Sequence, residues 1–205
     1  MSREIPILFR DELVLRILAD EQDLTRRVGP RWARVKPGDR LRVRETFALP
    51  ACVDDLSPSA TGLLALDAGY RNPWAPTWFR SDGHYNNAVA PPDATYDWGG
   101  RGRWRPSIHM PRWACRLVLE VVSVTRTATS SCTNTCVETL ADVGRCQASH
   151  CGRPHGSVCT VLPDLDDAEA RREGLADRAA FLALWAKLHP DHVGPVYRVQ
   201  FRRLP

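Results

Sequence analysis

The sequence predicts an α+β fold, in which a small β-barrel carries flanking helices and one long irregular loop. Segments with the two-residue alternation of strands occur near both ends of the chain, and segments with helical periodicity lie between them. The expected order is strand, helix, strand, long loop, strand, insert, helix, helix and strand. Helices that do not recur regularly between strands fit a barrel with helical additions better than a doubly wound sheet. A length of 205 residues fits one domain, so we expect residues 1–205 to form a single domain.

The first 47 residues predict a strand, a helix and a second strand. Residues 5–9 are apolar, and Pro6 among them favours an edge strand because proline has no N–H to donate. Asp11 is a suitable N-cap for the helix. The apolar residues of this helix share one face, namely Leu13, Val14, Ile17 and Leu18. Thr25 is expected at the turn after the helix, and residues 41–47 alternate as a strand does.

The middle of the chain, residues 48–112, predicts the long irregular loop. It holds half of the 16 prolines and four of the seven tryptophans. A loop of this length inside a compact domain is normally functional, so we expect short strands within it and a lid or binding surface. Residues 115–125 then form the clearest strand of the chain.

The C-terminal part predicts two helices and a last strand. Residues 165–173 form a short helix that Gly174 ends, and Asp177 caps a second helix that ends before Pro190. The apolar face of the second helix contains Phe181, Leu184, Trp185 and Leu188. Residues 197–202 alternate again between apolar and polar side chains, which predicts the final strand.

The charge is mildly positive and unevenly distributed. The formal net charge is +4, and residues 98–126 contain six arginines but one acid, Glu120. The tryptophans among these arginines favour binding of a polyanion with stacking of its bases, whereas the alternative is a solvated surface above core tryptophans. No apolar run reaches the ~18 residues of a membrane span, and the first residues lack a secretory apolar region, so we expect an intracellular protein.

Several motifs together resemble a known family. They are residues 24–28, the PGDRLRVRET run at 37–46, RSDG at 80–83, RWRPSIHMPRWA at 103–114, and 169–175. These motifs resemble the ASCH domain family of the PUA-like superfamily, in the form common in bacteriophage and prophage genomes. The resemblance covers about residues 3–47, 78–125 and 163–205. It implies a PUA-like barrel, a cleft for RNA or a modified nucleobase, and a phage- or prophage-encoded protein in the cytoplasm of a bacterial host.

Some small members of that family remove the acyl group from N4-acetylcytidine. The resemblance places their catalytic threonine on Thr25, the following arginine on Arg27 and a later glutamate on Glu173. Their catalytic lysine, however, falls on Gln22. A neutral amide cannot accept the proton that a threonine nucleophile must lose. His109 is a candidate replacement base, and its alternative role is that of a structural hydrogen-bonding group.

The polar residues of the motifs are the candidate contacts to a nucleobase or a phosphate. Glu45 shares a strand face with apolar residues, so it is expected either to pair with Arg27 or Arg105 inside the protein or to accept from an exocyclic amine in a cavity. The nucleic-acid site is predicted to comprise Arg27, Arg44, Glu45, Trp104, Arg105, Ser107 and Arg112. We expect Thr25 and Glu173 to converge with these side chains on one hollow.

Residues 126–162 form a Cys/His-rich insert to which the resemblance does not extend. The insert contains Cys132, Cys136, Cys146, Cys151 and Cys159, together with His150 and His155. Because it is polar and rich in serine and threonine, it cannot build a core of its own, and it would need disulfides or a bound metal to be ordered. Structural zinc is one interpretation, and disulfides or a loosely ordered insert are the others. The predicted ligands are Cys132, Cys136, Cys146 and Cys151.

The sequence therefore leaves three functions open. The first is a module that binds RNA, single-stranded nucleic acid or a modified nucleoside through the basic, tryptophan-containing stretch. The second is an amidohydrolase acting on N4-acylated cytosine nucleosides, or a ribonuclease. The third is a phage-encoded interaction module, in which the insert contacts a protein partner.

Overall fold

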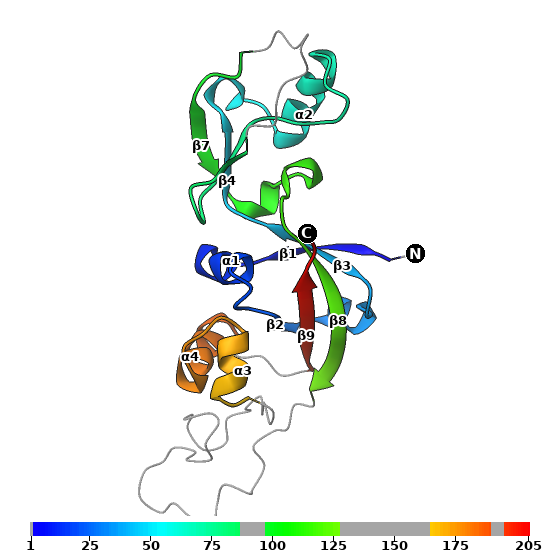
Figure 1. Ribbon diagram of the computed structural model, residues 1–205, viewed down its shortest axis with the longest axis vertical. Helices are drawn as coiled ribbons and strands as arrows, with labels where there is room; N and C mark the ends of the chain where they lie inside the picture. The colour runs from blue at the N-terminus through cyan, green and yellow to red at the C-terminus, as the bar shows by residue number, and fades with distance from the viewer. Residues whose placement is uncertain (1, 87–96, 128–164, 190–194) are drawn as a thin grey trace, which may run out of the picture. The chain divides into compact units, whose positions relative to one another are not determined.

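The computed structural model describes residues 2–86, 97–127, 165–189 and 195–205, and it shows a mixed α+β protein (Figure 1). The described residues group into two compact units. The first comprises Met1–Ala19, Asp39–Glu120 and Arg203–Pro205, and the second comprises Asp20–Gly38 and Val121–Arg202. The predicted α+β class is confirmed, whereas the single domain over residues 1–205 stays a prediction.

One sheet has five strands in the order β1-β3-β8-β9-β2. In the first unit, β1 (Glu4–Leu8) pairs in parallel with β3 (Arg40–Arg44), and β3 pairs antiparallel with the first residues of β8 (Val118–Thr127). The edge position that Pro6 predicts for its strand is confirmed, because β1 ends the sheet. Helix α1 (Asp11–Leu18) follows β1, and it buries Val14 and Ile17 as its periodicity predicts.

A second sheet lies within residues 47–105 of the first unit. Its strands are β4 (Phe47–Pro50), β5 (Thr77–Phe79), β6 (Tyr85–Asn86) and β7 (Arg101–Arg105), in the order β6-β5-β4-β7. Helix α2 (Pro58–Asp67) and the short 3-10 turns η2 (Ala51–Val53), η3 (Ser107–His109) and η4 (Arg112–Ala114) accompany it. All strand pairs in this sheet are antiparallel.

The stretch predicted to be a long irregular loop is therefore a folded module with its own core. This core contains Phe47, Leu49, Val53, Ala65, Ala75, Phe79, Trp98, Met110 and Ala114. The short strands expected within it are confirmed, whereas its irregular character was wrong. The strands have only two to five residues, too few for a periodic pattern between prolines and glycines. The predicted strand 41–47 also divides between two sheets, since β3 ends at Arg44 and β4 begins at Phe47.

The second unit combines β2 (Leu24–Val28), β9 (Val196–Arg203) and the later part of β8 with helices. Strand β2 pairs antiparallel with β9, which is also the neighbour of β8. Helices α3 (Asp167–Arg172) and α4 (Arg178–Leu188) begin at aspartate caps, and η1 (Pro30–Arg34) buries Trp32. Asp177 accepts from the Ala180 N–H at 2.7 Å, which confirms the predicted N-cap.

Two details of this unit differ from the sequence prediction. Thr25 lies within strand β2 and not in a turn, because a five-residue strand with three polar residues at its centre shows no apolar alternation. Helix α4 buries Phe181, whereas Leu188 of the predicted apolar face is 51% exposed. Among the described residues, no helix has the length and apolar character that a membrane span requires.

Candidate nucleic-acid interface

Three aromatic side chains lie on one face of the second sheet. Trp104 on β7 is directly opposite Ala48 on β4, Ala48 is opposite Trp78 on β5, and Trp78 is opposite Tyr85 on β6. Residues directly opposite one another in antiparallel strands project from the same face. Trp104, Trp78 and Tyr85 therefore form a row across the four strands, which we call the aromatic row.

The opposite face of this sheet faces the core. Phe47 on β4 is directly opposite both Phe79 and Arg105, so these three side chains project away from the aromatic row. Phe47 and Phe79 are completely buried, and Arg105 is 7% exposed. The alternation of strands thus requires that the neighbouring residues, among them Trp104 and Trp78, project to the other side.

The aromatic row is accessible at both ends. Trp104 is 38% exposed and Tyr85 is 39% exposed, while Ala48 between the tryptophans is completely buried. The rings of Trp78 and Tyr85 stack with centroids 4.4 Å apart and planes 17° apart. The Arg101 guanidinium lies 4.6 Å from the centroid of the Trp104 ring, a cation–π contact. Exposed aromatic faces beside a guanidinium are suited to stacking on nucleobases.

A buried ion-pair network holds the loop that joins β5 to β6. Glu45 is completely buried, and its carboxylate accepts from Ser81 Oγ at 2.8 Å and from Arg116 Nε and Nη2 at 3.1 and 2.8 Å. Arg116 also donates from Nη1 to Asp82 at 2.8 Å, and its guanidinium lies 4.0 Å from the Phe79 ring centroid. The loop residues Ser81 and Asp82 are thereby fixed next to the strands that carry Trp78 and Tyr85.

The charges of this network shift the pKa values of two of its members. Burial favours the neutral form of Asp82, but the hydrogen bonds from Arg116 and the His84 backbone outweigh it and lower the pKa of Asp82. For Arg116, burial favours the neutral form, while hydrogen bonds to Glu45 and Asp82 outweigh it and raise the pKa. The internal ion pair predicted for Glu45 is thus confirmed, but its partner is Arg116, which the sequence did not name; Arg105 binds backbone carbonyls instead.

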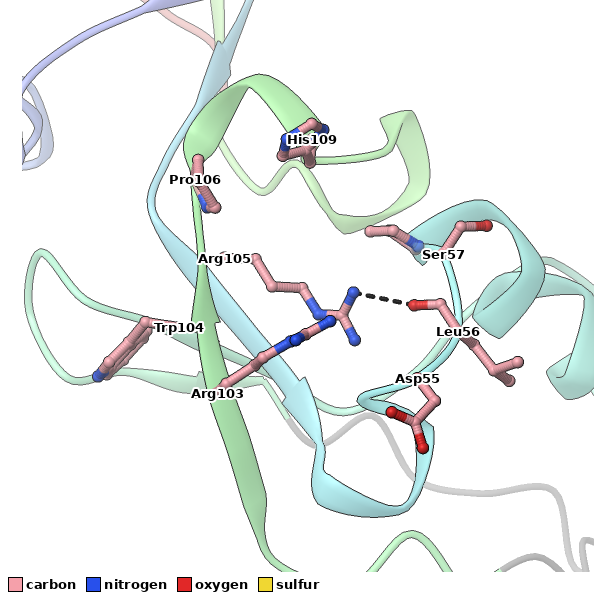
Figure 2. A pocket seen from close by; sticks show the side chains of 9 residues that line it. Asp55, Leu56, Ser57, Arg103, Trp104, Arg105, Pro106 and His109 are labelled. Atoms are coloured by element: carbon pink, nitrogen blue, oxygen red, sulfur yellow. Dashed lines mark hydrogen bonds between the residues drawn. The ribbon is translucent and has the colours of Figure 1, made fainter.

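A pocket of about 520 Å³ lies beside β7. Its lining comprises Asp55, Leu56, Ser57, Pro58, Arg103, Trp104, Arg105, Pro106 and His109. In Figure 2 the Arg103 and Arg105 side chains point toward Leu56, whereas the Trp104 ring points to the other side of the strand. The pocket and the Trp104 end of the aromatic row are therefore on opposite sides of β7.

Arg105 holds the wall of this pocket. Its Nη1 donates to the Leu56 carbonyl at 2.9 Å, and its Nη2 donates to the carbonyls of Val53 and Asp54 at 2.9 and 3.1 Å. Burial, with the nearby charge of Arg103, lowers the pKa of Arg105. Because these donors are occupied by backbone oxygens, Arg105 fixes the segment 53–56. Arg103 is exposed, and its Nη2 also donates to the Asp54 carbonyl at 2.8 Å.

The residues predicted for the site divide between the two units. Trp104, Arg105 and His109 all line the pocket, and Ser107 lies in η3 next to it in sequence. Arg44 donates to the Ile108 carbonyl at 2.9 Å, and Arg112 is an exposed side chain paired with Glu4. Thr25, Arg27 and Glu173 belong to the second unit, so the common hollow stays a prediction.

Glu173 lies at the free edge of strand β2. Its carboxylate accepts from the Arg26 backbone N–H at 3.0 Å and forms a short ion pair with the Arg26 guanidinium. Burial raises the pKa of Glu173 to about 7, although Arg26 acts in the opposite direction. Arg26 also pairs with Glu169, which Arg198 contacts from β9. Glu173 thus satisfies an N–H of β2 on the side where no strand of the described residues pairs with it, a structural reason for an acid at a helix end.

The remaining residues implied by the family resemblance lie near this cluster in the chain. Thr25 is 5% exposed, and burial lowers the pKa of Arg27 to about 10. Gln22, at the position of the family's lysine, is buried and donates from Nε2 to the Leu24 carbonyl at 3.0 Å. Its Oε1 has no hydrogen-bond partner in the part of the chain that the structure describes. The catalytic roles of Thr25, Glu173 and His109 stay predictions.

The sequence did not single out Trp78, Tyr85, Arg101 or Arg116. One signal could have found the first two, because Asp82-Gly83 between aromatic residues favours a β-hairpin. The four predicted zinc ligands, Cys132, Cys136, Cys146 and Cys151, lie outside the described residues. Within the described ranges, no group of three or more His, Cys, Asp or Glu side chains could hold a metal ion. No family model, curated protein or solved structure matches the chain.

Proposed function

We propose that the protein binds single-stranded nucleic acid, with bases stacked on the aromatic row. The observation that carries this proposal is the strand register that places Trp104, Trp78 and Tyr85 on one face. Four-stranded sheets whose aromatic side chains stack two or three bases are a common solution for binding RNA. Adjacent strands are about 4.8 Å apart, so Trp104 and Trp78 lie roughly 10 Å apart across β4, which leaves room for separate bases.

The charges around the row support a polyanion as the ligand. Arg101 is exposed on β7 and stacks on Trp104, while Arg103 is exposed on the pocket side of the same strand. His84, in the loop beside Tyr85, is exposed as well. Guanidinium groups beside stacked bases contact phosphates and also stack on bases themselves. A face that is aromatic and cationic together fits a nucleic acid better than an apolar partner.

The family resemblance supports the same class of ligand. We propose that the chain forms an ASCH-type, PUA-like domain and that it is a phage- or prophage-encoded cytoplasmic protein. We also propose that zinc is a structural metal of residues 126–162. The RWRPSIHMPRWA motif contributes to this proposal, since its residues lie in β7, η3 and η4. The motif therefore contains Trp104 of the aromatic row and the Arg103, Arg105 and His109 side chains of the pocket.

The test is fluorescence anisotropy with labelled single-stranded RNA and DNA of about twelve nucleotides, a length within the range of single-strand binding sites. Trp104→Ala and Trp78→Ala should each raise Kd about 10- to 100-fold, because each stacked base contributes about 1–3 kcal/mol. Trp104→Phe should retain most of the affinity. Leu63→Ala is the matched control, since Leu63 is a 58% exposed residue of α2 that is not in the row.

Salt gives an independent readout of the same proposal. Kd should rise steeply with salt concentration, because phosphate contacts release counterions. Circular dichroism would establish that each variant remains folded. The proposal is wrong if neither RNA nor DNA binds the folded wild-type protein at low salt.

A further inference from the structure

We infer that the pocket beside β7 holds one nucleotide of the strand whose neighbouring bases stack on the aromatic row. This inference rests on the proposed function. Trp104 connects the two sites, because it lines the pocket while its ring projects to the row on the other side of β7 (Figure 2). Because β7 is an edge strand of its sheet, a nucleic-acid strand that stacks a base on Trp104 would bring a following nucleotide to the pocket by passing around β7.

The pocket has the size and the apolar walls that a nucleotide requires. Its volume of about 520 Å³ lies within the range of small-molecule sites, about 300–1,000 Å³. Leu56, Pro58 and Pro106 supply apolar surface for the faces of a base, and Leu56 is 37% exposed there. These walls do not depend on a flexible loop, since Arg105 binds the carbonyls of Val53, Asp54 and Leu56.

The polar groups of the pocket include both donors and acceptors. Arg103 and His109 are exposed groups that can donate to a phosphate, and the Asp55 carboxylate can accept from an exocyclic amine or a ribose hydroxyl. Ser57 Oγ is engaged as the cap of α2, accepting from the Ala60 N–H at 3.1 Å. The Arg105 guanidinium lies 3.5 Å from a carboxylate oxygen of Asp54, and Asp55 adds a second acid to the lining. Arg103 donates from Nη2 to the Asp54 carbonyl at 2.8 Å.

The presence of both basic and acidic side chains around the pocket indicates which class of ligand it can bind. A bare anion would meet acidic as well as basic side chains, so inorganic phosphate gains little from this pocket. A nucleotide presents an anion for Arg103 and a hydrogen-bond donor for Asp55 at the same time. The pocket therefore fits a nucleotide better than phosphate alone.

The experiment separates the pocket from the row by using two probes. A nucleoside monophosphate probes the pocket alone, and a single-stranded RNA of about twelve nucleotides probes both sites. Leu56→Trp fills the pocket and should abolish monophosphate binding, measured by NMR titration, while raising the Kd for RNA about tenfold. Trp78→Ala should weaken RNA binding and leave monophosphate binding unchanged. Leu63→Trp, an exposed residue of α2 outside the pocket, should change neither.

A second variant covers the case in which Leu56→Trp does not fold. Arg103→Met removes the exposed guanidinium and should weaken monophosphate binding about tenfold. If wild-type protein binds RNA but no monophosphate at millimolar concentration, the inference is overturned while the proposed function stands. It is overturned too if phosphate competes as well as the monophosphate, or if both pocket variants bind RNA like wild type. Absence of RNA binding by wild-type protein would remove the proposed function itself.

Discussion

An acid at the C-terminal end of a helix opposes the helix dipole, so Glu173 needs compensation at the scale of single residues. Arg26 provides it twice, through its backbone N–H and through its guanidinium. Burial nevertheless raises the pKa of Glu173 to about 7. The ordinary pKa of 4.5 applies to the unfolded chain, so folding is linked to the protonation of this carboxyl between those two pH values.

The pH dependence of stability should reveal this linkage. Because the folded-state pKa is raised, the contribution of Glu173 to stability is fully present below about pH 4.5 and is lost as the pH rises through about 7. Glu173→Gln has no carboxyl that titrates at this position. The difference in the free energy of unfolding, wild type minus variant, should therefore fall as the pH rises from about 4.5 to about 7. We expect a fall on the order of 1–3 kcal/mol in urea titrations. A difference that is constant with pH would contradict this role.

Glu45 and Arg116 form a buried ion pair, as Glu173 and Arg26 do. Removing one member of a buried ion pair leaves an uncompensated charge, which costs about 3–5 kcal/mol. Arg116→Met should therefore reduce the free energy of unfolding by about that amount, because Glu45 is completely buried. Arg112→Met is the matched control, since the Arg112 side chain is 77% exposed and its pair with Glu4 should contribute less than about 1 kcal/mol. Equal effects in denaturant titrations would refute the assignment.

At the scale of elements, the sequence predicted those that have enough length for a periodic pattern. The α1 helix and the β1, β8 and β9 strands follow from apolar spacing, and α4 follows from its aspartate cap. Strand β2 was not predicted, and the short strands expected within residues 48–112 could not be placed at particular residues, because these strands are short and bounded by turns. Trp104 was predicted as a base-binding residue, but its row with Trp78 and Tyr85 depends on strand pairing that no local pattern contains.

Helix α2 contains a glycine, Gly62, at a position where packing leaves no room for a side chain. Alanine would favour the helix over Gly62 by about 1 kcal/mol in a solvated position. A Cβ at Gly62 would lie 2.5 Å from Trp113 Nε1, however, so the indole and the helix would have to separate. Gly62→Ala should therefore destabilise the protein by about 1–3 kcal/mol, the usual cost of overpacking. Ser59→Ala, on the exposed side of the same helix, should change the thermal midpoint little, and a stabilised Gly62→Ala variant would refute the packing argument.

At the scale of the whole molecule, some of the arginines make internal contacts and are not available to bind phosphates. Of the six in residues 98–126, Arg105 and Arg116 have roles inside the first unit, and Arg112 pairs with Glu4. Arg101 and Arg103 remain exposed on β7, and Arg126 is exposed near the end of β8. The basic stretch therefore predicts more phosphate contacts than the fold offers, and the salt dependence of binding should correspond to about two or three contacts, not six.

The cysteines of residues 126–162 carry the one prediction that concerns a metal. Four thiolates from Cys132, Cys136, Cys146 and Cys151 would satisfy a tetrahedral zinc ion. Protein purified without added zinc should contain about one equivalent by elemental analysis, and a value below about half an equivalent would refute the prediction. Cys132→Ser should lower the zinc content, whereas Cys52→Ser, outside the insert, should not.

A small side chain lies between the two tryptophans of the second sheet. Ala48 occupies the position on β4 between Trp104 and Trp78, and the surrounding atoms cover it completely. A longer side chain at this point would act as a wedge and tilt the indoles apart. The gap between the two indoles thus depends on a buried methyl group as well as on the spacing of the strands.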